Sequence, residues 1–188
     1  MSGRLFHTAH KFLGHLPGGL AIATIGACAG FSAICGSTSA TAATMAAVAL
    51  PEMKKYDYDP ALATGVVAAG GSLGILIPPS TIFIIYGIMT EQSVGKLFMS
   101  GVLPGILLTV LFIVTILIWT KLQPEICKKA PKATWKERAA SLTGVIETFI
   151  LFFMVMGGLF VGFFTPTEAA AIGAFGTLLI ALVGRNLS

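Results

Sequence analysis

The stretch Cys35-Gly36-Ser37-Thr38-Ser39 lies near the middle of forty consecutive residues, 12 to 51, that carry no formal charge. A glycine and three adjacent hydroxyl groups in such an apolar run need partners, because burying unpaired polar atoms is costly. Those partners are either neighbouring protein groups or a bound cargo. The segments on either side of this stretch show which kind of fold surrounds it.

The composition is that of a membrane protein. The 188 residues are 55% hydrophobic and 11% charged, with a mean hydropathy of +0.89, whereas soluble domains carry about 25% charged residues. A membrane-spanning helix needs roughly 20 apolar residues, so most of the long uncharged segments have room for one. These segments are residues 12–51, 60–90, 97–120, 148–167 and 169–184. The three cysteines include no Cys-x-x-Cys pair and are expected to be small buried side chains.

Residues 18–50 are predicted to form a re-entrant helical hairpin with residues 35–39 at its tip. If both ends of the hairpin lie on one side of the membrane, eleven of the twelve Lys and Arg residues share that side; a full crossing leaves nine together. The positive-inside rule therefore favours the hairpin. Irregular backbone at membrane depth also survives only where it is buried in protein or lines a cavity.

Residues 61–90 are predicted to form a broken helix. The segment Gly70-Gly71-Ser72-Leu73-Gly74 and then Pro78-Pro79-Ser80 are expected to interrupt it. Proline lacks a backbone N–H and disfavours helix at the residue before it, so a break at 78–79 is nearly forced.

Two interrupted elements predict an ion and substrate site of the kind found at the midplane of secondary transporters. Hydroxyl and carbonyl oxygens suit a hard cation, and the N-termini of half-helices attract carboxylates. The predicted sodium half-site comprises Ser37, Thr38, Ser39, Gly71, Ser72 and Gly74. The predicted substrate-binding residues are Gly36, Ser37, Pro78, Pro79 and Ser80. The alternative is that these small residues merely let helices pack closely.

The remaining segments complete an all-α membrane fold. Residues 1–17 are expected to form a basic interfacial helix, and residues 51–60 a polar turn. Residues 97–120 are expected to form a lipid-facing span, and residues 141–163 and 167–183 two further spans. The loop at 121–140 is expected on the cytoplasmic side, and a capping box over 134–137 predicts a short interfacial helix within it. Between the last two spans, Thr165-Pro166-Thr167-Glu168 predicts a helix that begins with a hydroxyl cap, a proline and a glutamate.

The sequence motifs that could indicate an enzyme are incomplete. A serine nucleophile at Ser37 needs a base within reach, and all three histidines lie in the N-terminal stretch, where their spacing suits a solvated helix face. The glycines at 70–74 are not followed by the Gly-Lys-Ser/Thr of a nucleotide loop. The chain is therefore not expected to be an enzyme.

Several motifs in order resemble the large membrane subunit of TRAP (tripartite ATP-independent periplasmic) transporters. Residues 35–45 (CGSTSATAATM) and 49–53 (ALPEM) are similar to the first hairpin of that family, and residues 68–80 (AAGGSLGILIPPS) to its broken helix. Two further segments, 15–20 (HLPGGL) and 162–171 (GFFTPTEAAA), also match.

The resemblance implies a sodium-driven symporter with an elevator-type fold in the bacterial inner membrane. It would import organic acids such as C4-dicarboxylates or sialic acid, with sodium as coupling ion and no organic cofactor. A periplasmic substrate-binding protein would deliver the substrate, and a small membrane subunit would brace the scaffold. By position, the resemblance implies that residues 18–96 form half of a transport domain and residues 97–120 a scaffold helix. Residues 121–140 would form a cytoplasmic amphipathic arm, and residues 141–188 two scaffold helices.

The family pattern has two inverted repeats, each with a hairpin and a broken helix, whereas this chain contains one of each. It is expected to be a fragment or truncated chain that holds the first half-site and the start of the second repeat. The hairpin and broken helix contain no arginine, so a side-chain cation for a substrate carboxylate would come from the other half. Two alternatives stay open: a channel-like pore subunit, and a fragment that is inactive alone.

Overall fold

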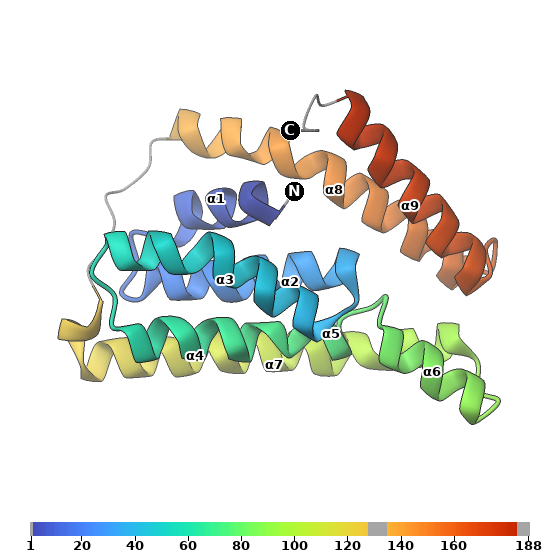
Figure 1. Cartoon of the computed structure of the whole chain (residues 1–188), viewed down its shortest axis with the longest axis horizontal. Coiled ribbons are helices and arrows are strands. Elements are labelled where there is room, and N and C mark those ends of the chain that lie inside the picture. Colours follow the sequence, from blue (N-terminus) through green and yellow to red (C-terminus); the bar gives the residue numbers. More distant parts are fainter. Residues whose placement is uncertain (1, 128–134, 184–188) are drawn as a thin grey trace.

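The computed structural model describes residues 2–127 and 135–183, which form helices joined by short turns (Figure 1). In chain order the helices are α1 (Ser2–Leu13), α2 (Gly19–Cys35), α3 (Thr38–Lys55), α4 (Pro60–Gly71), α5 (Leu73–Leu76), α6 (Thr81–Met89), α7 (Val94–Leu122), the 3-10 helix η1 (Pro124–Ile126), α8 (Trp135–Val161) and α9 (Pro166–Val183). The all-helical fold class is confirmed for these residues.

Helices α2 and α3 form a helical hairpin. Gly36 ends α2 with φ +60°, a conformation that costs glycine little, and its N–H donates to the carbonyl oxygen of Ser32 at 2.9 Å. Ser37 is extended and caps α3, so the chain reverses over two residues. Both ends of the hairpin lie at the same end of the molecule, where the N–H of Leu20 donates to the hydroxyl of Tyr58, which follows α3, at 3.2 Å.

Helix α3 extends further than predicted. Residues 51–55 were expected in a polar turn, but α3 includes Pro51 and ends at Lys55. Met53 is completely buried in the main core. Burying a methionine side chain contributes about 1.5–3 kcal/mol, which offsets much of the roughly 3 kcal/mol that a proline costs inside a helix. The turn therefore begins at Tyr56.

The broken helix is interrupted at both predicted places, but unequally. Helix α4 ends at Gly71 and α5 begins at Leu73, so Ser72 separates them. This first interruption is slight, because the φ of −62° and ψ of −20° at Ser72 are helical. The sharp break lies at residues 77–80, between α5 and α6, where two prolines remove the N–H donors that a helix needs.

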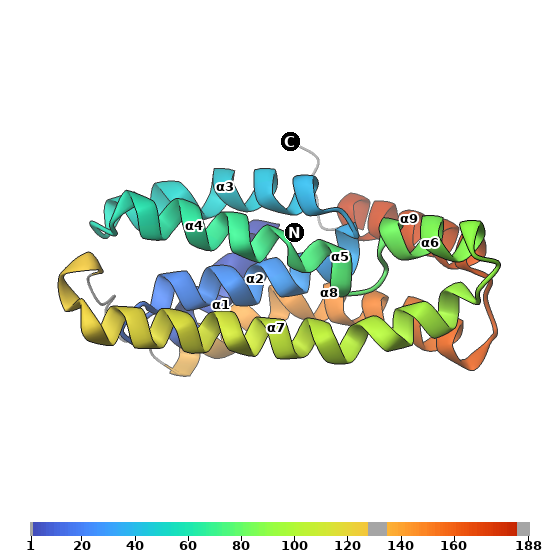
Figure 2. The same cartoon turned by 90° about the horizontal axis from the view of Figure 1, so that it is seen from below.

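Helix α2 is central to the larger core and contacts α1, α3, α4, α5 and α7 (Figure 2). Most of its residues are small or apolar and buried, which lets the neighbouring helices approach closely. Helix α7 buries Phe98, Gly101 and Gly105 on its inner face. Large side chains such as Leu103 and Leu107 are exposed on its other face, as expected of a helix that faces lipid.

Helices α8 and α9 pack against α6 and α7 through a second cluster that includes Phe98 and Met156. The cap predicted for α9 is confirmed, since the hydroxyl of Thr165 donates to the carboxylate of Glu168 at 2.9 Å and accepts from its N–H at 3.3 Å. Helix α8 is continuous from Trp135, so a short helix separate from the span at 141–163 is not observed. Part of the predicted arm, residues 128–134, and residues 184–188 lie outside the described residues.

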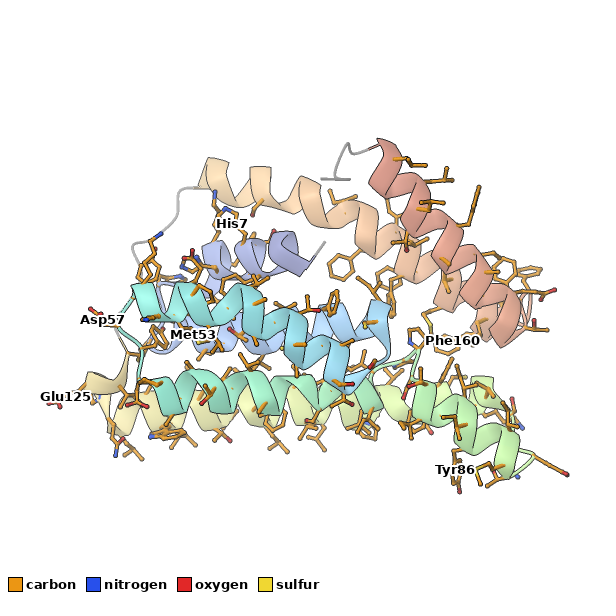
Figure 3. The ribbon with its side chains drawn as sticks, in the orientation of Figure 1. His7, Met53, Asp57, Tyr86, Glu125 and Phe160 are labelled. Atoms are coloured by element: carbon orange, nitrogen blue, oxygen red, sulfur yellow. The ribbon has the colours of Figure 1, made fainter. Side chains whose placement is uncertain are left out.

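Two helical segments in the described part of the chain are long and apolar enough to cross a membrane: Pro60–Met89, counted across the break, and Val94–Leu122. Asp57 and Glu125 lie at one end of these segments, and Tyr86 lies at the opposite end (Figure 3). The loops at 56–59 and 123–127 thus lie at the same end of the molecule.

Candidate functional site

The turn of the α2–α3 hairpin lies against the break between α5 and α6 (Figure 1). A Cβ added to Gly36 would overlap the carbonyl oxygen of Pro79, and one added to Gly74 would lie 2.9 Å from the backbone nitrogen of Thr38. Four helix ends therefore meet here: the C-terminal ends of α2 and α5 and the N-terminal ends of α3 and α6. Such ends present carbonyl oxygens and N–H groups without partners inside the helix.

The prolines leave two carbonyl oxygens without their helical donors. In a continuous helix the carbonyls of Gly74 and Ile75 would accept from the N–H groups of residues 78 and 79, and both residues are proline. Gly74 also contacts the backbone of Ser37 and Thr38. The end of α5, where these two helical donors are missing, thus lies beside the hydroxyl-rich turn of the hairpin.

The glycines at the end of α4 serve close packing. A Cβ on Gly71 would lie 2.7 Å from that of Ala42, and one on Gly70 would lie 2.7 Å from the sulfur of Cys28. The hydroxyl of Ser72 donates to the carbonyl oxygen of its own helix at Ala69, at 2.6 Å. This segment fixes the distance between the broken helix and both arms of the hairpin.

Three buried hydroxyl groups near the meeting point have no hydrogen-bond partner: those of Ser32, Thr41 and Ser80. All three residues are completely buried. A buried unpaired hydroxyl costs about 1–3 kcal/mol, so these oxygens are candidates for ligands of a bound ion. Ser32 and Thr41 lie about one helical turn from the hairpin tip and were missed by sequence reasoning, because burial depends on packing against other helices.

The structure brings most of the predicted site residues together. Thr38 and Ser37 contact Gly74, while Gly36 contacts Pro79 and lies beside Ser80. Within the hairpin the hydroxyl of Ser37 accepts from the N–H of Ala40 at 3.5 Å. Of the other predicted site residues, Ser39 is exposed and Pro78 is buried. Gly71 and Ser72 lie at the junction of α4 and α5.

A cavity of about 460 Å³ adjoins the meeting point between α2, α6 and the α8–α9 pair. Ala33, Ile34 and Pro79 line it on one side, and Phe152 and Leu159 on the other. Its walls are mostly apolar, so it offers little for a carboxylate. Of the residues predicted to bind substrate, Pro79 alone contributes to its lining.

Acidic and basic side chains lie elsewhere. The hairpin at 18–50 and the broken helix at 61–90 contain no Asp, Glu, Lys, Arg or His. At the far end of the hairpin, burial raises the pKa of Tyr58 to about 12. Burial also lowers the pKa of His10 on α1, against the opposing effect of Glu52. The described residues include no cluster of three or more His, Cys, Asp or Glu for a metal ion, so the oxygens at the meeting point are carbonyls and hydroxyls.

An apolar segment of membrane-spanning length broken near its middle, with a helical hairpin packed against the break, is an arrangement also found at the sites of secondary transporters. Comparison with known families is specific: residues 1–188 match the DctM component of the tripartite ATP-independent periplasmic transporters. The chain belongs to this family.

Curated relatives support the assignment. The chain is 40% identical over 179 residues to the C4-dicarboxylate TRAP transporter large permease protein DctM of Pseudomonas aeruginosa, covering 95% of this chain and 42% of the relative. It is 40% identical over 197 residues to the isethionate TRAP transporter permease protein DctMQ of Oleidesulfovibrio alaskensis, covering 100% and 30%. The sialic acid TRAP transporter permease protein SiaT of Haemophilus influenzae is 34% identical over 182 residues, covering 94% and 28%. The chain thus spans less than half the length of these relatives, which are named as transporter permeases and not as enzymes.

Proposed function

We propose that this chain is part of the large membrane subunit of a sodium-coupled symporter that imports organic acids across the bacterial inner membrane. A periplasmic binding protein would deliver the acid, and a small membrane subunit would brace the assembly. The names of the relatives support the class of transporter. The observation that carries sodium coupling is the meeting of four helix ends at the hairpin turn.

The donor set at the meeting point suits sodium. Hydroxyls of Ser37, Thr38 and Ser80 and the carbonyl oxygens of Gly74 and Ile75 are hard, uncharged oxygen ligands. A site built from such ligands alone carries no negative charge that would favour a divalent cation. The buried, unpaired hydroxyl of Ser80 gains the partner that it lacks within the protein.

The organic acid would bind beside the ion. The N-terminal ends of α3 and α6 direct their partial positive charge toward the meeting point, which favours a carboxylate. The bound sodium adds a full positive charge at the same place. Because the hairpin and the broken helix contain no arginine, these helix ends and the ion are what this half of the site offers to an anion.

Transport would follow an elevator movement of the hairpin and broken helix. Their backbones touch at Gly36 and Gly74 without intervening side chains, so the two elements are expected to move together and carry the site across the membrane. A channel with a passive pathway would not require this rigid coupling.

The test is uptake by the intact permease with its partner proteins in vesicles. Replacing both Ser37 and Ser39 with alanine should raise the half-saturating sodium concentration about tenfold or more, the equivalent of about 1.4 kcal/mol. Thr115→Val is the control, because this exposed residue of α7 also loses a hydroxyl, one that donates to its own helix. Unchanged sodium dependence in the double variant would refute the site, and uptake that never exceeds the external concentration would favour a channel.

A further inference from the structure

Thr81 links the two interrupted elements. Its N–H and its hydroxyl both donate to the carbonyl oxygen of Gly36, at 3.2 and 3.1 Å. Thr81 is the first residue of α6, and Gly36 is the first residue of the hairpin turn, 45 positions earlier in the chain. One side chain thus fastens the turn of the hairpin to the far half of the broken helix.

These bonds leave Gly36 no free backbone group. A carbonyl oxygen has two lone pairs, and Thr81 uses both of them. The N–H of Gly36 donates to Ser32. Gly36 therefore shapes the turn, and the groups that the hairpin can offer to an ion begin at Ser37.

The position of those groups depends on contacts on both sides of the turn. On the α5 side, the absent side chain of Gly74 lets the backbone of Ser37 and Thr38 approach closely. On the α6 side, the bonds from Thr81 hold Gly36 against the chain at Pro79. Without the threonine hydroxyl, one of the two bonds on that side is lost while the backbone N–H remains.

We propose that Thr81 is a positioning residue for sodium: its hydroxyl holds the hairpin turn at the distance from the broken helix at which the Ser37 and Thr38 oxygens bind the ion. This inference rests on the proposed sodium coupling. In this proposal the hydroxyl of Thr81 acts through Gly36 and is not itself a ligand of the ion. Losing one hydrogen bond of this kind weakens the arrangement enough to change an affinity about threefold to tenfold.

The test compares Thr81→Val, which removes the hydroxyl and keeps the N–H, with Thr81→Ser, which keeps both. Thr81 is exposed, so valine introduces no overpacking; Thr81→Ala is the second variant if valine lowers expression. Thr90→Val is the matched control, since Thr90 lies just past the other end of α6 and its hydroxyl donates to its own helix at Tyr86.

In sodium-driven uptake by the intact permease, valine or alanine at position 81 should raise the half-saturating sodium concentration threefold to tenfold. Maximal uptake at saturating sodium should stay near that of the wild type, as should both parameters of the serine and Thr90 variants. A lower melting temperature and lower maximal uptake at an unchanged half-saturating sodium would show a structural role alone and overturn the proposal. If uptake by the wild-type permease does not depend on the sodium concentration, the proposed sodium coupling is overturned as well. This dependence is measured before any variant is made.

Discussion

Gly36→Ala tests how tightly the hairpin turn sits against the break. Gly36 has φ +60°, where a residue with a Cβ costs about 1–2 kcal/mol. The new Cβ would also overlap the carbonyl oxygen of Pro79, and overpacking costs typically about 1–3 kcal/mol. The two effects together predict a loss of about 2–5 kcal/mol in the free energy of unfolding.

Gly162→Ala separates these two effects. Gly162 follows α8 with φ +86°, and a Cβ added there would have nothing within 4 Å. It should therefore show the conformational cost alone, about 1–2 kcal/mol. Both variants can be compared by thermal unfolding of the purified permease in detergent, followed by far-UV circular dichroism. Each kcal/mol lowers Tm by about 2–4 °C in a protein of 150–250 residues and by less in a longer one.

The comparison has a clear refuting outcome. If Gly36→Ala and Gly162→Ala lower Tm equally, the backbone of Gly36 does not lie against the chain at Pro79, and the meeting of the helix ends is wrong. A larger loss for Gly36→Ala should come with a weaker response of uptake to sodium, since displacing the turn moves the hydroxyls at 37 and 38. Gly162→Ala should leave that response unchanged.

Three further predictions concern the hairpin and its surroundings. Gly74→Ala should reduce sodium-dependent uptake severalfold, because its Cβ would meet the backbone of the hairpin turn. Gly65→Ala is the control, because a Cβ there would have nothing within 4 Å. It should leave uptake intact and stabilise α4 by up to about 1 kcal/mol. Tyr58→Phe removes the acceptor of the buried Leu20 N–H and should cost about 1–3 kcal/mol, measured as a lower Tm; an unchanged Tm would refute this bond. Since burial lowers the pKa of His10 below 6.5, its neutral form stabilises the fold above that pH, and stability should fall as the pH drops from 6.5 through the lower folded-state pKa. His10→Gln should remove this part of the decline in Tm, and an identical pH profile would contradict the assignment.

The two chain interruptions were predictable because each has a local cause. Glycine followed by hydroxyl residues predicts the end of one helix and the cap of the next, and Gly36 and Ser37 do this. Consecutive prolines at 78 and 79 remove two N–H donors in any surroundings, so a break follows whatever packs nearby. The cap at Thr165 has the same local character.

Other features depend on contacts between distant segments and could not be read from local sequence. Helix α3 passes Pro51 because Met53 reaches a core built from several helices. The glycines at 70–74 interrupt the helix only slightly, and their close contact with α2 and α3 was not predictable from the local sequence. The bonds from Thr81 to Gly36 join residues 45 positions apart, and no pattern within either segment indicates its partner.

The same distant contacts bear on how the proposed transporter would move. A hairpin that opened on its own, as a gate, would have to break both bonds between Thr81 and Gly36 and separate backbones that touch at Gly74. Backbone contacts of this kind cannot adjust by changing a rotamer, because glycine has no side chain to move. Separation would also expose the buried hydroxyls of Ser32 and Ser80. The lower-cost movement keeps the turn and the break together, so the proposed ion site would travel intact with both elements.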